Sequence, residues 1–483
     1  MSDSSPRKTI PIVPEPAGTD GDEISLYAAS KKIYPRTVQG VFAQWRWGFV
    51  VLTQLLFYGL PWLEWGQRQA VLFDLGARRF YIFGLVLYPQ DFIYLTGLLI
   101  ISALSLFLFT AVAGRLWCGY ACPQTVYSEL FMWIERKIEG DRSARMRLDE
   151  GDFSLEKLVK KWYKHLVWIF LSIWTGFTFV GYFTPIRDLV MEFFLERMSS
   201  WEVFWVFFYG FATYGNAGFM REQVCKYMCP YARFQSAMFD KDTLIVTYDA
   251  ERGEPRGARS KKADLASLSL GACVDCTLCV QVCPTGIDIR NGLQYECIGC
   301  GACADVCDTV MDKVGYPRGL VKYSTQHAMQ NKWTASQTFK HIFRPRVLIY
   351  TGILLLVVSL LLGSLLTRKS FKVDVVRDRA TFARIVSGGN IENVYRLQIM
   401  NAAEKRQHFK VTAEGLYELK VLTDSEDLTV ESTQSRWVSV RLQVPYDSAV
   451  PGSYPVRFTI EASDDNETGH TQLEEKSVFL IPR

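Results

Sequence analysis

Eight of the twelve cysteines occur in two short runs that share one spacing. The runs are CVDCTLCVQVCP and CIGCGACADVCD, so their cysteines are separated by two, two and three residues. Such a run wraps three thiolates around one corner of a [4Fe-4S] cluster, and its fourth cysteine begins a turn away from it. Zinc, the alternative, pairs one CxxC with a distant CxxC, and the doubled run leaves no such partition. We therefore predict two [4Fe-4S] clusters.

The doubled run resembles that of bacterial two-cluster ferredoxins, in which the fourth cysteine of each run ligates the other cluster. Asp308 stands where the second run usually has proline, and we expect it to alter the local turn or the reduction potential with ligation intact. The resemblance implies that one cluster takes Cys273, Cys276, Cys279 and Cys307, and that the other takes Cys297, Cys300, Cys303 and Cys283.

The remaining four cysteines form two copies of another motif, CxxxCP, in WCGYACP and VCKYMCP. If the backbone is helical through each copy, thiols four residues apart share one face and can bind one soft ion together. Thiolates favour Cu(I), whereas zinc, another iron-sulfur cluster or simple packing stay open. The motifs predict a copper site at Cys118, Cys122, Cys225 and Cys229.

Other side chains near these motifs are weaker candidates. Met220, Met228 and Met238 flank the second CxxxCP motif and could offer thioethers to Cu(I), but methionine more commonly fills gaps at helix ends. His165 opens an apolar stretch, where a solvated interfacial histidine is commoner than a quinol or metal contact.

Five apolar stretches are long enough to cross a bilayer as helices. Trp and Tyr mark several of their ends, as they do in interfacial belts. The last stretch, VLIYTGILLLVVSLLLGSLL, carries no charged residue. The five predicted spans are residues 47–63, 92–113, 165–183, 201–219 and 347–366.

The orientation of these spans follows from Lys and Arg in the segments between them. Residues 114–161 contain nine and residues 220–346 contain seventeen, against three in 64–91 and two in 184–199. Basic loops stay inside, so every cysteine is predicted to lie on the inner side, where a reducing compartment favours thiolate ligands. Residues 1–40 have no cleavable signal pattern and are expected to form an inner tail.

After the last span, short runs alternate apolar and polar residues between Gly, Asp, Asn and Ser clusters. This pattern predicts an antiparallel β-sandwich of immunoglobulin type, and the segment has no cysteine for an inter-sheet disulfide. The predicted strands are residues 394–400, 408–414, 437–444, 454–462 and 477–483.

The predicted fold is therefore multi-domain: an α-helical membrane bundle, a ferredoxin-like 2[4Fe-4S] domain and a C-terminal Ig-like β-sandwich. We predict an inner tail at 1–44, four transmembrane helices with both CxxxCP motifs at 45–240, a linker at 241–262, the ferredoxin-type domain at 263–320, a second linker at 321–346, a fifth transmembrane helix at 347–366 and the outer sandwich at 371–483.

Composition agrees with a membrane protein and excludes a disordered one. Hydrophobic residues make up 49% of the 483 residues, and 54 Lys and Arg stand against 50 Asp and Glu. The formal net charge of +4 is too small to indicate nucleic-acid binding, so no nucleic-acid partner is expected.

The order of spans, two CxxxCP motifs, an eight-cysteine ferredoxin segment and an outer β-domain resembles the FixG/RdxA/CcoG family over nearly the whole chain. Members are cytochrome c oxidase accessory proteins of the bacterial inner membrane. The resemblance implies a cytoplasmic iron-sulfur domain, a periplasmic sandwich, and cupric reduction during assembly of the cbb3-type oxidase. Implied partners are copper, oxidase subunits and copper chaperones or transporters, with an unidentified electron donor.

We therefore expect an iron-sulfur electron-transfer protein that acts as a cupric reductase. Thiolates bind Cu(I) better than Cu(II), so a cysteine site raises the copper potential and favours reduction. Two alternatives stay open. One is a quinol-linked electron carrier like the membrane ferredoxin NapH, which resembles the front half and lacks the outer domain. The other is a non-catalytic scaffold for oxidase assembly.

Overall fold

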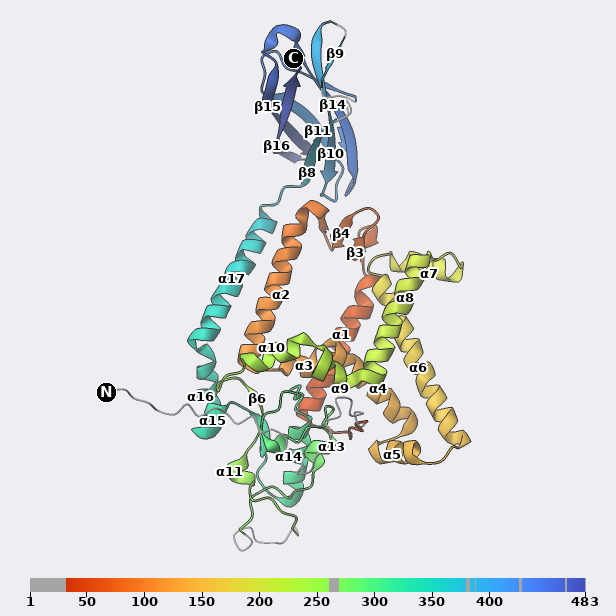
Figure 1. Cartoon of the computed structure of the whole chain (residues 1–483), viewed down its shortest axis with the longest axis vertical. Helices are drawn as coiled ribbons and strands as arrows, with labels where there is room; N and C mark the ends of the chain where they lie inside the picture. The colour runs from red at the N-terminus through yellow and green to blue at the C-terminus, as the bar shows by residue number, and fades with distance from the viewer. Residues whose placement is uncertain are drawn as a thin grey trace, which may run out of the picture.

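The computed structural model describes residues 32–259, 269–378, 383–386, 388–424, 428–464 and 467–482 of the 483-residue chain. A cysteine-rich domain lies at one end of the long axis, helices form the middle, and a β-domain lies at the other end (Figure 1). Residues 1–31 of the predicted tail, and residues 260–268 at the predicted start of the ferredoxin domain, lie outside the described residues.

The middle of the molecule contains a helix at each of the five predicted spans. They are α1 (Val41–Gly59), α2 (Phe92–Ala113), α6 (Leu155–Val180), α8 (Ser200–Thr213), which continues as π-helical turns over Tyr214–Met220, and α17 (Pro345–Leu366). In the described chain, Pro89–Ala113 and Pro345–Leu366 have the length and apolar composition needed to cross a membrane. The other three helices do not meet that measure, so the number of spans stays a prediction.

Helices α2 and α17 run side by side between the two end domains (Figure 1). They contact at Gly97, where an added Cβ would lie 2.7 Å from Leu361 Cδ1. The Tyr94 hydroxyl lies 3.2 Å from the Ser364 hydroxyl, so the helices also share a polar contact near the ends that adjoin the β-domain. Their remaining apolar surface is almost entirely exposed, as expected for helices that face lipid.

The segment between α1 and α2, for which no strand was predicted, contains short strands. A three-stranded antiparallel sheet is formed by β3 (Val71–Asp74), β4 (Arg79–Ile82) and β5 (Leu85–Leu87). Leu72, Tyr81 and Val86 of this sheet bury their side chains together with Met400 of the β-domain. The small sheet thus provides the surface on which the β-domain rests.

Polar contacts also attach the β-domain to this surface. The Tyr88 hydroxyl donates to the Asn401 carbonyl at 2.8 Å. The buried Asp91 carboxylate accepts from Arg368 at 2.7 Å and from the Lys372 ammonium. Because Asp91 immediately precedes α2 and Arg368 follows α17, this cluster ties both helices to the β-domain.

The β-domain is a sandwich of two antiparallel sheets, and four of the predicted strands lie within its strands, while the fifth, predicted at 477–483, overlaps β16 up to Ile481. One sheet has the order β12-β14-β10-β8 with β9 on β10, and the other has the order β13-β11-β15-β16. The strands are β8 (Phe371–Arg377), β9 (Arg384–Ile385), β10 (Asn390–Asn401), β11 (Gln407–Glu414), β12 (Lys420–Thr423), β13 (Leu428–Val430), β14 (Ser435–Pro445), β15 (Gly452–Asp464) and β16 (Glu467–Ile481). Alternate residues of β10 and β14, such as Leu397 and Val440, are fully buried between the sheets.

The cysteine-rich domain is closed by two strands that come from outside its predicted bounds. Strand β6 (Ile245–Tyr248) pairs antiparallel with β7 (Val321–Ser324). The prediction that 241–262 and 321–346 are linkers is therefore wrong for these two parts, which belong to the domain. Each strand has only four residues, too few for an alternating pattern to be recognised in the sequence.

Smaller elements connect these parts. They are β1 (Glu64–Trp65), β2 (Arg68–Gln69), α5 (Arg142–Glu150), α7 (Ile186–Phe194), α9 (Arg221–Gln223), α11 (Ala250–Gly253), α15 (Gln326–Gln330) and α16 (Ala335–Lys340).

Candidate metal centres

Two cavities in the cysteine-rich domain are each lined by cysteines from both runs. One contains the first three cysteines of the first run and the last of the second, namely Cys273, Cys276, Cys279 and Cys307. The other contains Cys283 together with Cys297, Cys300 and Cys303, and Cys279 also reaches it. All twelve cysteines of the chain are free thiols. Four thiol donors around one cavity fit a [4Fe-4S] cluster, which is held by four cysteines.

The backbone follows the same path through both runs. Asp275 and Thr277 in the first run have positive φ angles of 50° and 55°, and Gly299 and Gly301 have 65° and 73° at the equivalent positions of the second. These left-handed residues turn the chain so that successive thiols face one cavity. The second loop needs glycine there for a further reason: a Cβ on Gly301 would lie 2.9 Å from Phe42.

Helix α14 (Ala302–Val314) distributes its two cysteines between the cavities. Cys303 and Cys307 lie one turn apart, and each lines a different cavity. The helix continues through Asp308, whose carboxylate accepts from the Gly319 amide at 2.8 Å. Asp308 thus fixes the segment that leads into β7, a contact that a proline side chain could not make.

Burial sets the protonation of these thiols. It raises the pKa of Cys297 and of Cys307 to about 12, and that of Cys279 to about 11. The guanidinium of Arg290 opposes the shift at Cys279, and that of Arg115 opposes it at Cys297. Such thiols are protonated at neutral pH, so binding of a metal must release protons.

The two CxxxCP motifs share a backbone that is not helical throughout, so the condition under which both thiols of a motif share one helical face is not met. Cys118 lies in the short helix α3 (Leu116–Tyr120), and Cys225 lies in the π-helical turn Val224–Met228. Cys122 and Cys229 are extended N-cap residues of α4 (Pro123–Glu139) and α10 (Pro230–Met238). The proline after each second cysteine disfavours the helical conformation there and starts the next helix.

Side chains beside the motifs bring the two copies together. Gln124, two residues after Cys122, donates through Nε2 to the carbonyls of Asn216 at 2.9 Å and Arg221 at 3.1 Å. Arg221 in turn donates to the buried Glu135 of α4 at 2.7 Å. Burial raises the pKa of Glu135, but Arg221, Lys164 and Arg145 outweigh it, so its net pKa is lowered and the carboxylate stays charged.

The four CxxxCP thiols lie near enough to influence one another. Burial and the neighbouring Cys122 raise the pKa of Cys118 to about 12, and Cys225 contributes to the same shift. Burial raises the pKa of Cys225 to about 11, with contributions from Cys122 and Cys229. The Cys118 thiol donates to Gln235 Oε1 at 3.3 Å. The structure therefore gathers both motifs into one region.

This region lies directly against the second cysteine-lined cavity. Cys118 and Cys225 pack against the buried group that contains Ile298 and Cys300. At the closest point Gly119 faces backbone only, because a Cβ added there would lie 2.8 Å from Cys300 Cα and 2.9 Å from Cys300 N. Glycine at position 119 thus permits the first CxxxCP motif to touch the backbone of a second-run cysteine.

Arg115, beside the first CxxxCP motif, connects this motif to the second CxxxCP motif and to the second cysteine run. Its side chain is buried, and its guanidinium donates to the carbonyls of Tyr295 and Ala232. Tyr295 precedes the second cysteine run, and Ala232 follows the second CxxxCP motif. A buried cation at this position lowers the pKa of both Cys118 and Cys225 against the effect of burial.

Sequence reasoning missed Arg115 and Gly119. The sequence did show an arginine two residues after an apolar span and a glycine inside the first CxxxCP motif. Neither feature alone is specific enough to mark a functional residue. Among the weaker candidates, His165 Nδ1 is 2.9 Å from the Tyr214 hydroxyl and its ring stacks on Phe219. Met228 is largely exposed. In the described chain, no three His, Cys, Asp or Glu side chains have the arrangement of a single-ion site.

Three family models match the chain. A 4Fe-4S dicluster domain matches residues 220–326, which contain both cysteine runs and the second CxxxCP motif. A 4Fe-4S binding domain matches residues 95–140, where the only cysteines are Cys118 and Cys122. The Ig-like fold found at the C-terminus of FixG matches residues 361–482. The matches confirm iron-sulfur domains and an Ig-like C-terminal domain.

The chain is similar to characterised relatives over most of its length. It is 39% identical to nitrogen fixation protein FixG of Rhizobium meliloti over 424 residues, which cover 81% of this chain and 80% of FixG. It is 38% identical to protein RdxA of Cereibacter sphaeroides over 436 residues, 88% of this chain and 91% of RdxA. Protein RdxB of the same organism is also 38% identical, over 85% of this chain and 88% of RdxB. The chain therefore belongs to the FixG/RdxA family of iron-sulfur electron-transfer proteins.

Proposed function

We propose that this protein is a membrane-bound cupric reductase that supplies Cu(I) for assembly of a cbb3-type oxidase. In this proposal Cys273, Cys276, Cys279 and Cys307 hold one [4Fe-4S] cluster, and Cys297, Cys300, Cys303 and Cys283 hold the other. Each set lines its own cavity. When bound, such clusters supply electrons one at a time, as the reduction of Cu(II) to Cu(I) requires.

The substrate copper is proposed to bind at Cys118, Cys122, Cys225 and Cys229. The observation that carries the proposal is the contact of Gly119 with Cys300, because it sets a soft-ligand site against the second cavity. The buried Arg115 compensates negative charge on the thiolates. Its hydrogen bonds to the Tyr295 and Ala232 carbonyls also hold the two CxxxCP motifs and the second cysteine run together. Because the four thiols are not arranged as a single-ion site in the described chain, copper binding requires their side chains to draw closer.

The proposed membrane orientation puts the cysteine-rich domain in the cytoplasm and the sandwich in the periplasm of a bacterial inner membrane. Its support is the arrangement in which α2 and α17 separate the two end domains (Figure 1), together with the excess of Lys and Arg in 114–161 and 220–346. The sandwich, fixed to the outer ends of both helices, would then face oxidase subunits or copper carriers in the periplasm. A purely scaffolding role would need only this domain.

A second candidate function has a specific observation in its favour. The match of a 4Fe-4S binding domain to residues 95–140 covers a segment whose only cysteines are Cys118 and Cys122. Four thiolates from the two CxxxCP motifs would then hold a third cluster, and the protein would be an electron carrier linked to a membrane quinol, with no copper site.

Metal analysis of the anaerobically purified full chain separates these functions. The cupric reductase is expected to contain about eight iron and eight sulfide per chain and to bind Cu(I) in addition. Cys118→Ser and Cys225→Ser are expected to weaken copper binding while iron is unchanged, since serine has nearly the size of cysteine but offers a hard oxygen. About twelve iron per chain, reduced to about eight by the same substitutions, would contradict the copper site and establish the third cluster.

A further inference from the structure

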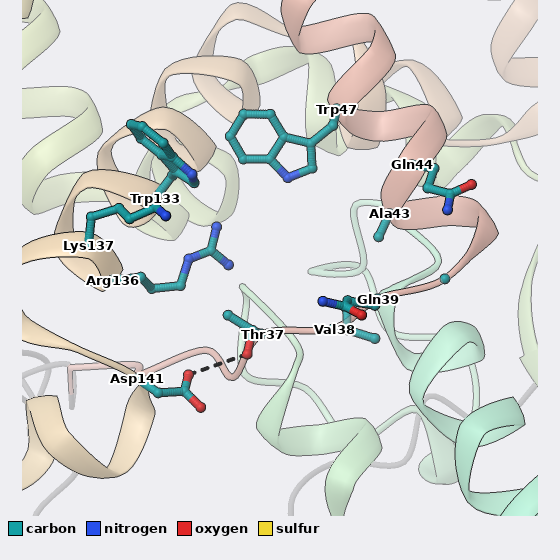
Figure 2. A pocket seen from close by; sticks show the side chains of 11 residues that line it. Thr37, Val38, Gln39, Ala43, Gln44, Trp47, Trp133, Arg136, Lys137 and Asp141 are labelled. Carbon is teal, nitrogen blue, oxygen red and sulfur yellow. Dashed lines mark hydrogen bonds between the residues drawn. The ribbon is translucent and has the colours of Figure 1, made fainter.

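We infer that the cavity between α1 and α4 binds the headgroup of an anionic phospholipid of the inner leaflet, such as phosphatidylglycerol. The inference rests on the orientation proposed above, which brings these helix ends to the cytoplasmic surface of the membrane. The cavity has a volume of about 650 Å3, within the range of sites for small ligands. Figure 2 shows residues 37–40, the start of α1, the end of α4 and Asp141 surrounding it.

Two indole rings form the apolar part of the cavity. Trp47 of α1 and Trp133 of α4 have ring centroids 6.4 Å apart at 65°, and both face the open space in Figure 2. Tryptophan is enriched where headgroups meet acyl chains, so this part suits the glycerol and upper chain of a lipid.

Positive charge forms the second part of the cavity. Lys137 Nζ lies 5.8 Å from the Trp133 ring centroid. Arg136 lies 3.4 Å from one oxygen of the buried Glu129, whose other oxygen is 3.8 Å from Arg46. Glu129 and Arg46 lie outside the lining, so Arg136 shares its carboxylate partner with a second guanidinium, and Lys137 is the second cation of the cavity.

The charge balance matches a phosphodiester. Asp141, whose carboxylate accepts from the Thr37 hydroxyl at 3.4 Å, is the acidic group of the lining. Two cations, Arg136 and Lys137, thus face one carboxylate in the lining, which leaves one positive charge for one phosphate. The amide side chains of Gln39 and Gln44 also line the cavity and can hydrogen-bond ester or glycerol oxygens. A free phosphate would use the cations but not the indoles, so a lipid accounts for both parts.

The cavity also adjoins the cysteine-rich domain. Val38, in its lining, packs against the buried group of Ile298 and Cys300. The first amides of α1 donate to the Asp305 carboxylate of α14, at 2.8 Å from Ala43. A bound lipid would therefore stabilise the segment that covers the second cysteine-lined cavity.

Native mass spectrometry of the full chain in neutral detergent tests the inference. Phosphatidylglycerol is titrated against phosphatidylcholine of the same acyl chains, with soluble glycerol phosphate as competitor. We expect phosphatidylglycerol to bind at least tenfold more tightly than phosphatidylcholine, and Arg136→Gln/Lys137→Gln to remove that preference. The control Lys313→Gln/Lys332→Gln, which removes two exposed charges of the cysteine-rich domain, should keep it.

Lys137→Glu serves as a second variant if the double substitution fails to fold, since it leaves the pairing of Arg136 with Glu129 intact. It should lower phosphatidylglycerol binding and leave phosphatidylcholine unchanged. Equal binding of both lipids, or full displacement by glycerol phosphate, would overturn the inference. A reporter that places Gly140 outside the cell would instead overturn the orientation proposed above, so the two failures are distinguishable.

Discussion

Replacing Gly119 with alanine tests the contact between the first CxxxCP motif and the second cysteine-lined cavity. The new Cβ would lie 2.8 Å from Cys300 Cα and 2.9 Å from Cys300 N and the Gly299 carbonyl oxygen. Carbon atoms in ordinary contact are about 3.5–4.0 Å apart, so the segments must separate by roughly 0.7 Å. All three neighbours are backbone atoms, which cannot rotate away.

Overpacking of this kind costs about 1–3 kcal/mol, which shifts the equilibrium between packed and separated segments roughly 5- to 150-fold. We therefore expect Gly119→Ala to lose iron faster from the purified protein and to form Cu(I) more slowly, because the copper site is displaced from Cys300. Iron and sulfide analysis and stopped-flow detection of Cu(I) measure the two effects.

Gly48→Ala is the matched control, since a Cβ at this position in α1 meets nothing within 4 Å. It is expected to be neutral or to stabilise the helix by up to about 1 kcal/mol. If Gly119→Ala retained iron and formed Cu(I) at wild-type rates, the reasoning would be refuted. The contact between Gly119 and Cys300 would then affect neither cluster stability nor electron transfer to copper.

Three further predictions concern the clusters, the orientation and the sandwich. Cys279→Ser is expected to lose one cluster and weaken the other, because Cys279 lines one cavity and reaches the second, and iron analysis with electron paramagnetic resonance reads this out; stoichiometric zinc without labile sulfide would contradict the assignment. A reporter fused after Arg368 should be active only outside and one at Gly140 only inside, whereas activity of both on one side would remove the proposed separation of domains. Asp91→Asn should destabilise the attachment of the sandwich by about 1–3 kcal/mol, since it removes the charge that Arg368 and Lys372 share; limited proteolysis at the wild-type rate would show that the attachment does not depend on this cluster.

Local patterns were sufficient to predict the cysteine sets and the sandwich. The doubled spacing predicted two clusters, and the resemblance to two-cluster ferredoxins implied how the cysteines divide between them; that ligation stays a prediction, although the two cavities are lined by the corresponding cysteines, with Cys279 reaching both. Alternation in β10 and β14 predicted the buried faces because a strand with one buried side has period two. The apolar lengths of α2 and α17 predicted two helices, and their apolar surfaces are almost unburied in the described structure.

Features that depend on contacts between distant segments could not be predicted. The pairing of β6 with β7 joins residues more than 70 positions apart, and neither strand is long enough to show a period. The contacts of Gly119 and Arg115 were invisible for the same reason, since each residue is defined by what another segment places beside it. The sequence also left the backbone of the CxxxCP motifs open, and there the proline imposes an extended second cysteine.

A single-turnover reaction tests the central claim most directly. The full chain is reduced with dithionite, freed of excess reductant without oxygen, and mixed with Cu(II) in the presence of a Cu(I)-specific chromophore. The account predicts about two Cu(I) per chain, one for each [4Fe-4S] cluster that is oxidised, and slow Cu(I) formation in a Cys118→Ser/Cys225→Ser variant that keeps its iron. Reduced clusters that persist in the presence of Cu(II), or wild-type rates in that variant, would contradict the account.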